Sequence, residues 1–99
     1  MIIVSGTVEI DAGDMERALV AVRAMVAETV KEDGCITYEF SRVIDRDTSF
    51  RIYEEWRDVA ALQAHGKSAH MGVFRAALGE LNVLSRDVFM VEAGEKTSL

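Results

Sequence analysis

Both histidines and the single tryptophan fall within one short stretch of the chain, residues 54–74, EEWRDVAALQAHGKSAHMGVF. Histidine is the side chain best suited to moving protons near neutral pH, so His65 and His70 are candidate bases. Trp56 could form an apolar wall beside them. A structural interpretation stays open as well, because histidines on an apolar stripe usually pack and hydrogen-bond, and a tryptophan at a strand end usually belongs to the core.

Other kinds of chemistry have weaker signatures in this sequence. His65 and His70 are spaced H-x4-H across a helix break, unlike the H-E-x-x-H pair on one helix face, so no metal site is expected. Cys35 has no basic neighbour and is explained as a small buried side chain. Neither G-x-G-x-x-G nor G-x-x-x-x-G-K-[ST] occurs, so no cofactor is expected.

The elements that must position these side chains follow from the hydrophobic pattern. Strands are expected over residues 2–10, 35–44, 50–56 and 83–92, with a polar turn at 45–49. A first helix is expected over about 13–32, capped by Asp11 and ended by Gly34. A second helix is split into two pieces, which begin at the caps Asp58 and Ser68 and are separated by Gly66.

This βαββαβ order, with the second helix split, predicts an α+β fold of the ferredoxin-like kind. The expected core is an antiparallel four-stranded sheet with helices on one face. The strands carry apolar residues on nearly both faces. Because an uncovered apolar face is an interaction surface, we expect a homodimer packed sheet to sheet.

Composition fits one domain and excludes several classes. The chain has 99 residues, 49% of them hydrophobic, which is enough for a single modest core. We assign residues 1–94 to that domain and 95–99 to a frayed tail. No membrane span or signal peptide is expected, and the single cysteine favours a reducing cytoplasm. A net charge of −6 without a Lys/Arg cluster argues against nucleic-acid binding.

From residue 34 to residue 70 the chain reads G-C-x-x-Y-E … F-x-x-x-E-x-W-x-x-x-x-A-L-x-x-H-x-x-S-x-H. This pattern resembles the antibiotic biosynthesis monooxygenase family, and within it the quinol-monooxygenase-like branch. The resemblance implies a dimeric α+β barrel with a pocket between sheet and helices in each subunit. It also implies a cofactor-independent monooxygenase that oxidises a small phenol or quinol with molecular oxygen. The residues assigned to catalysis are His70 and His65, and those assigned to substrate binding are Trp56, Tyr38, Phe74 and Leu62.

Two alternatives stay open beside this interpretation. Another branch of the family resembles an isomerase of a small, phosphorylated hydroxy-dicarbonyl compound, and paired histidines also suit proton shuttling next to a carbonyl. The chain could also be a non-catalytic dimeric module that binds a small aromatic molecule. Ile52 stands where polyketide-oxidising members carry asparagine, and His65 stands where haem-degrading members carry tryptophan, so those two activities are not expected.

Overall fold

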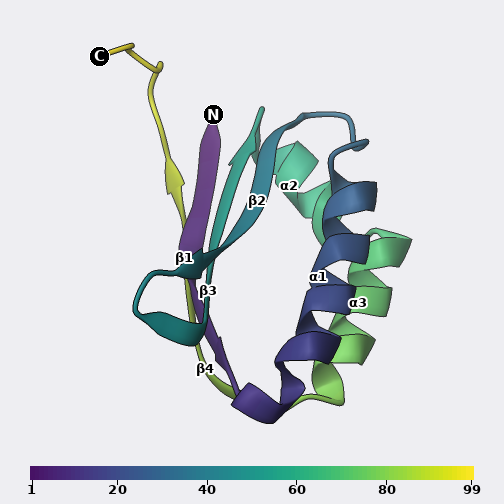
Figure 1. Cartoon of the computed structure of the whole chain (residues 1–99). Coiled ribbons are helices and arrows are strands. Elements are labelled where there is room, and N and C mark those ends of the chain that lie inside the picture. Colours follow the sequence, from purple (N-terminus) through teal and green to yellow (C-terminus); the bar gives the residue numbers. More distant parts are fainter.

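The computed structural model describes all 99 residues and has one sheet with helices on one of its sides (Figure 1). The strands pair antiparallel in the order β2-β3-β1-β4. This arrangement confirms the ferredoxin-like α+β fold with a split second helix. The elements are β1 (Ile2–Ile10), the 3-10 turn η1 (Ala12–Asp14), α1 (Met15–Thr29), β2 (Cys35–Val43), β3 (Arg46–Trp56), α2 (Val59–Gly66), α3 (Ala69–Gly79) and β4 (Val83–Glu92).

Alternation along β1 decides which sheet face becomes the core. Ile2, Val4, Val8 and Ile10 are buried on the side of the helices, and the residues that point to the opposite face are only partly covered. Successive strand side chains point to opposite faces, so an apolar residue at every second position buries one face. Burying one such aliphatic side chain stabilises the fold by roughly 1.5–3 kcal/mol.

Two element boundaries differ from the sequence-based expectation. Strand β3 begins at Arg46 instead of residue 50, and the hairpin turns at Asp45, which has a positive φ of 72°. The polar residues 46–49 extend the strand because Arg46 pairs with β2 and Ser49 pairs with β1. Helix α1 ends at Thr29, and Gly34, with φ 84°, instead turns the chain into β2.

Side-chain caps fix both pieces of the split helix, as their sequence indicates. Asp58 and Ser68 each accept a hydrogen bond from the backbone N–H three residues further on, at 2.8 and 3.2 Å. Asp11, in contrast, makes no capping hydrogen bond. The carboxylate of Asp14 accepts the backbone N–H of Asn82 at 2.8 Å and ties the start of α1 to the loop before β4.

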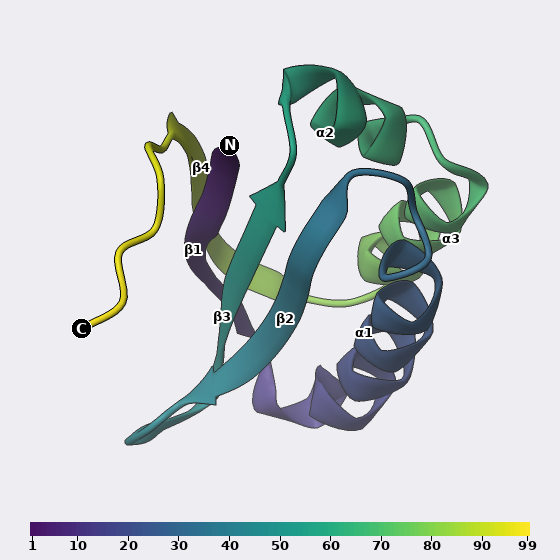
Figure 2. The same ribbon diagram turned by 90° about the horizontal axis from the view of Figure 1, so that it is seen from above.

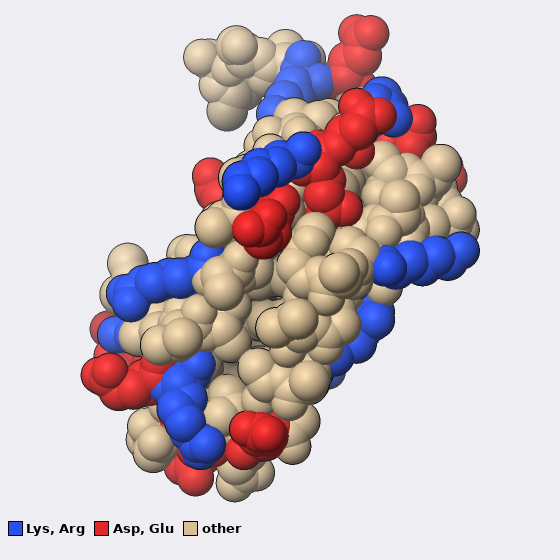
Figure 3. Space-filling view, turned by 90° about the vertical axis from the view of Figure 1, so that its right-hand side faces the viewer, with Lys and Arg blue, Asp and Glu red and all other residues tan.

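The helices cover the sheet unevenly. Helix α1 contacts β2 and α2 contacts β3, whereas α3 packs chiefly against α1. The inner face of β1 and β4 therefore has little helix directly above it. On the outside of the helix layer, charged side chains gather toward the edges and leave an uncharged middle, and Lys and Arg form no continuous patch on this face (Figure 3). No helix is long and apolar enough to cross a bilayer.

The face of the sheet away from the helices is more polar than the sequence-based interpretation expected. Ser5 and Thr7 of β1 lie there, and Arg51 donates a hydrogen bond to Ser5 Oγ at 3.1 Å. The C-terminal tail runs along this side of the sheet without regular structure (Figure 2). Within it, Lys96 Nζ lies 2.7 Å from a carboxylate oxygen of Glu55.

At Gly6 the backbone of β4 lies too close to β1 to leave room for a side chain. A Cβ at this position would lie 2.1 Å from the carbonyl oxygen of Asp87 and 2.5 Å from Cα of Val88. Both are backbone atoms in a paired strand and cannot rotate away. We expect Gly6→Ala to lower the free energy of unfolding by about 1–3 kcal/mol, the usual cost of overpacking, measured by urea denaturation.

Gly13→Ala is the matched control for that substitution, because nothing lies within 4 Å of a Cβ there. Its effect should stay within about 0.5 kcal/mol, as is usual for surface changes. If Gly6→Ala proved as stable as Gly13→Ala, the close approach of β4 to Gly6 would be wrong.

Candidate functional site

A cavity of about 650 Å³ lies between the sheet and the helices. It exists because α3 packs chiefly on α1, which leaves space between the helices and the inner face of β1 and β4. The exposed residues Arg86 and Met90 of β4 stand at its open side. Of its 22 lining residues 17 are hydrophobic, which is typical of a pocket that binds a small, largely apolar molecule.

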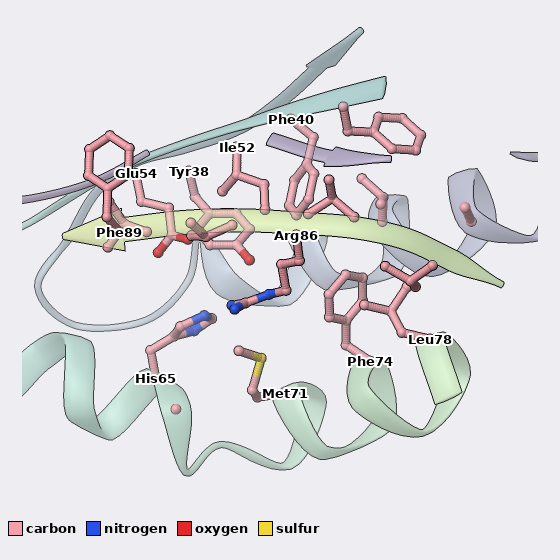
Figure 4. A pocket seen from close by; sticks show the side chains of 18 of the residues that line it. Tyr38, Phe40, Ile52, Glu54, His65, Met71, Phe74, Leu78, Arg86 and Phe89 are labelled. Atoms are coloured by element: carbon pink, nitrogen blue, oxygen red, sulfur yellow. The ribbon is translucent and has the colours of Figure 1, made fainter. Parts of the chain in front are cut away.

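Four polar side chains interrupt this apolar lining: Tyr38, Glu54, His65 and Arg86 (Figure 4). They come from β2, β3, the last turn of α2 and β4, so every layer of the fold contributes one or more. In the close-up view His65 and Arg86 approach the same part of the cavity. A few polar groups converging in an apolar cavity are what a specific small-molecule site requires.

His65 is held in one orientation by Glu32. Its Nδ1 lies 2.6 Å from Glu32 Oε2, and its side chain is only 2% exposed. Because a carboxylate can only accept, the neutral ring carries its proton on Nδ1 and keeps a lone pair on Nε2. That Nε2 is buried and has no hydrogen-bond partner. A buried ring nitrogen with a free lone pair beside a cavity is equipped to take a proton from a bound molecule.

Glu32 joins this ring to a second histidine. The same Oε2 lies 2.9 Å from Nε2 of His70, whose side chain is 21% exposed. The three groups thus link the buried ring to solvent. His70 does not line the main cavity, where we expected it. It stands at the start of α3 and, because α3 packs on α1, lies beside a smaller hollow between those two helices.

Trp56 is placed differently from the expected cavity wall. It is 0% exposed and is not among the cavity-lining residues. Its ring centroid lies 4.8 Å from that of His65, and its Nε1 donates to Glu54 Oε1 at 2.7 Å. As the last residue of β3 it faces the start of α2, so it packs behind the site and positions the side chains that line it.

The other three expected binding residues, Tyr38, Leu62 and Phe74, do line the cavity. The Tyr38 ring lies edge-on to His65, with the ring centroids 5.3 Å apart. Burial, reinforced by the nearby Glu54 carboxylate, raises the pKa of Tyr38 above its ordinary value, so its phenol stays protonated and can donate. Burial also raises the pKa of Glu54, which the hydrogen bond from Trp56 partly offsets.

Sequence reasoning missed Glu32, Glu54 and Arg86 as site residues. Glu32 lies in the loop after α1 and is 33 positions from the histidine it contacts, so no local spacing could reveal it. Arg86 lies on β4, and its residue type alone gives no reason to place it in a cavity. The structure directs its guanidinium into the cavity, where it forms no ion pair (Figure 4). The signal for it was indirect: it falls on the inward register of β4, opposite Val8.

Together the fold and the cavity define a class of small ferredoxin-like α+β subunits with a ligand pocket between sheet and helices. Within that class, the chain belongs to the antibiotic biosynthesis monooxygenase family, whose sequence profile matches residues 1–77. The family resemblance seen in the segment from residue 34 to residue 70 is therefore confirmed.

Individual relatives agree with this membership over the whole chain. A Bacillus subtilis protein named "Putative monooxygenase YcnE" is 26% identical over 95 residues, which span 96% of this chain and all of that protein. A crystal structure from Deinococcus radiodurans, described as a "putative antibiotic biosynthesis monooxygenase", is 27% identical with a TM-score of 0.93, covering 100% of this chain and 98% of that one. The structure of Rv0793 from Mycobacterium tuberculosis is 25% identical with a TM-score of 0.88, covering 98% of both chains.

Proposed function

We propose that this protein is a monooxygenase that oxidises a small phenol or quinol with molecular oxygen, with His65 as the general base. The observation that carries the proposal is the buried, unpartnered Nε2 of His65 at an apolar cavity of about 650 Å³. Family membership supports the reaction class. The size and apolar lining of the cavity support an aromatic substrate of one or two rings.

The proposed reaction starts with proton transfer. Nε2 of His65 takes the phenol proton, and Glu32 stabilises the imidazolium that forms through the hydrogen bond at Nδ1. The phenolate is electron-rich enough to pass electrons to oxygen. For a hydroquinone, the balanced outcome is one hydroxyquinone and one water from one substrate and one O2. The substrate supplies all four electrons, and the protein supplies binding, orientation and proton removal.

Arg86 provides the charge that would hold the substrate anion. It is the single cationic side chain in the cavity lining, and a positive charge favours the phenolate over the phenol. We expect Arg86→Met to raise KM by about tenfold, since one charge-assisted hydrogen bond is worth roughly 1.5–3 kcal/mol and this residue is partly solvated. Steady-state kinetics with a hydroquinone substrate measure this.

Arg23→Met is the control for that prediction, because Arg23 is an exposed arginine on α1 that does not line the cavity. Its KM should equal that of the wild type. Equal KM values for both variants would show that Arg86 does not contribute to substrate binding.

The two alternatives receive less support from the site. A phosphorylated substrate would need a cluster of cationic groups, and only Arg86 is present in the lining. A purely binding module would be favoured by histidines bonded to the main chain. Both histidine rings instead contact the Glu32 carboxylate, which orients them through side chains and not through the main chain.

The homodimer is part of this proposal. Val91 is 44% exposed on β4 and pairs with Ile3 on the face away from the helices. Such side chains favour a second copy over solvent. Sedimentation equilibrium at micromolar concentration should give twice the subunit mass, and a monomer would contradict this part.

A panel of hydroquinones and naphthohydroquinones tests the proposed function. The full chain, treated with a chelator and free of flavin absorbance, should consume oxygen above the autoxidation rate with at least one compound. An oxygen electrode records the rate, and heat-denatured protein serves as the blank. No protein-dependent uptake across the panel would refute the proposal.

A further inference from the structure

Three side chains able to bind metal come together at the edge of the site, from three separate elements. Glu32 lies in the loop after α1, His65 ends α2 and His70 begins α3. One ligand atom from each, Glu32 Oε2, His65 Nδ1 and His70 Nε2, lies within 4.8 Å of the other two. We propose that these three atoms form a Zn²⁺ site. The metal would replace the two hydrogen bonds between the Glu32 carboxylate and the imidazole rings.

The ligand set and its geometry suit zinc. Two imidazoles and one carboxylate, with a fourth position left open, form a recurrent zinc ligand set. Zinc–ligand bonds of about 2.0–2.2 Å place tetrahedral ligand atoms about 3.3–3.6 Å apart. The Glu32 oxygen now lies 2.6 and 2.9 Å from the two nitrogens. It would have to retreat by less than about 1 Å, and it sits on a loop that can allow this.

Charge and access also favour a divalent cation there. With neutral imidazoles the three ligands carry one negative charge. Glu32 and His70 are 16% and 21% exposed, so an ion can enter from solvent without opening the core. The sequence showed no such site because its H-x4-H spacing lacks the third ligand, which comes from 33 residues upstream.

Zinc at this position would change what His65 offers to the cavity. With the metal on Nδ1, the neutral ring must carry its proton on Nε2, which turns this buried nitrogen from an acceptor into a donor. Zinc would therefore block the base. This consequence rests on the proposed function, whereas the binding itself does not.

The test is a zinc titration of the full chain after chelator treatment, by isothermal calorimetry and by competition with a chromophoric chelator. We expect one Zn²⁺ per chain. His70→Ala and Glu32→Gln should each weaken binding by at least the 10–100-fold that is typical when even an outer-shell partner of a metal is lost. Both variants change partly exposed side chains, and circular dichroism checks that they fold.

Two control variants test whether other potential zinc ligands near the site bind the metal instead. Glu28→Gln changes an exposed carboxylate on α1 that pairs only with Lys31, and Cys35→Ser removes the one thiol. Both should bind zinc as the wild type does. Absence of 1:1 binding, or binding that survives Glu32→Gln and His70→Ala, would overturn the site.

A readout independent of activity follows the ring itself. Long-range ¹H–¹⁵N spectra distinguish the two imidazole tautomers, and zinc should move the His65 proton from Nδ1 to Nε2. Zinc binding with this change but without quinol turnover would support the metal site and count only against the proposed function. An unchanged His65 tautomer on saturation with zinc would contradict the metal site.

Discussion

Replacing His65 by glutamine is expected to lower kcat/KM for a hydroquinone by about 10²–10⁴-fold, the range that a positioned general base contributes. Glutamine keeps a polar side chain of similar length but has no basic nitrogen to accept a proton. The expected loss is large because neither the phenol nor the guanidinium that lines the cavity can replace the base. Tyr38 is held protonated and Arg86 is a cation.

His70→Gln separates this role from a structural one. His70 does not line the cavity and touches the base only through Glu32, so its loss should cost much less activity than loss of His65. Both variants should have the same far-ultraviolet circular dichroism as the wild type. A His65→Gln protein that retained most of its turnover would show that another group removes the proton.

Trp56→Ala is expected to lower the free energy of unfolding by about 3–5 kcal/mol, the usual cost of truncating a large core aromatic side chain. Trp56 is fully buried and packs against the His65 ring, and its truncation leaves a void at the point where β3 meets α2. The total free energy of unfolding of a small domain is only about 5–15 kcal/mol, so this variant should lose much of its stability. Urea denaturation measures the change.

Trp56→Phe isolates the hydrogen bond from the packing. Phenylalanine keeps a ring but removes the N–H that donates to Glu54 Oε1. Burial raises the pKa of Glu54 above its ordinary value of 4.5, and Glu32 pushes it further up while His65 pulls it down. The folded state therefore holds this proton more tightly than the unfolded chain, and stability falls as pH rises through the raised pKa.

Without the tryptophan donor that pKa should rise further, so the destabilisation of Trp56→Phe should be smallest in acid and grow toward neutral pH. Adding Glu54→Gln to Trp56→Phe should remove this pH-dependent part. A destabilisation that stayed constant from pH 4 to pH 8 would show that the hydrogen bond to Glu54 contributes nothing.

The fold could be predicted from sequence because its signals are local. The alternation in β1, the caps Asp58 and Ser68 and the break after Gly66 each report on a few neighbouring residues. The boundary at Arg46 was missed for the opposite reason. Polar residues there look like a turn, and only pairing with β1 and β2 keeps them in the strand.

The candidate site was predictable in its residue types but not in its arrangement. Nearness in the chain placed His65 and His70 close to each other, yet the packing of α3 against α1 decides that only His65 lines the cavity. The partner that orients both rings, Glu32, comes from a loop far away in the sequence. Long-range contacts of this kind leave no periodic trace, and a single sequence cannot show them.

Isotope labelling tests the central claim most directly. The wild-type chain, stripped of metal, is given its best hydroquinone substrate under ¹⁸O₂, and the product is analysed by mass spectrometry. The proposed reaction predicts one ¹⁸O atom in each hydroxyquinone and the second in water, with the labelled product lost in His65→Gln. An unlabelled quinone, with the oxygen recovered as hydrogen peroxide, would contradict monooxygenation and make the protein at most an oxidase.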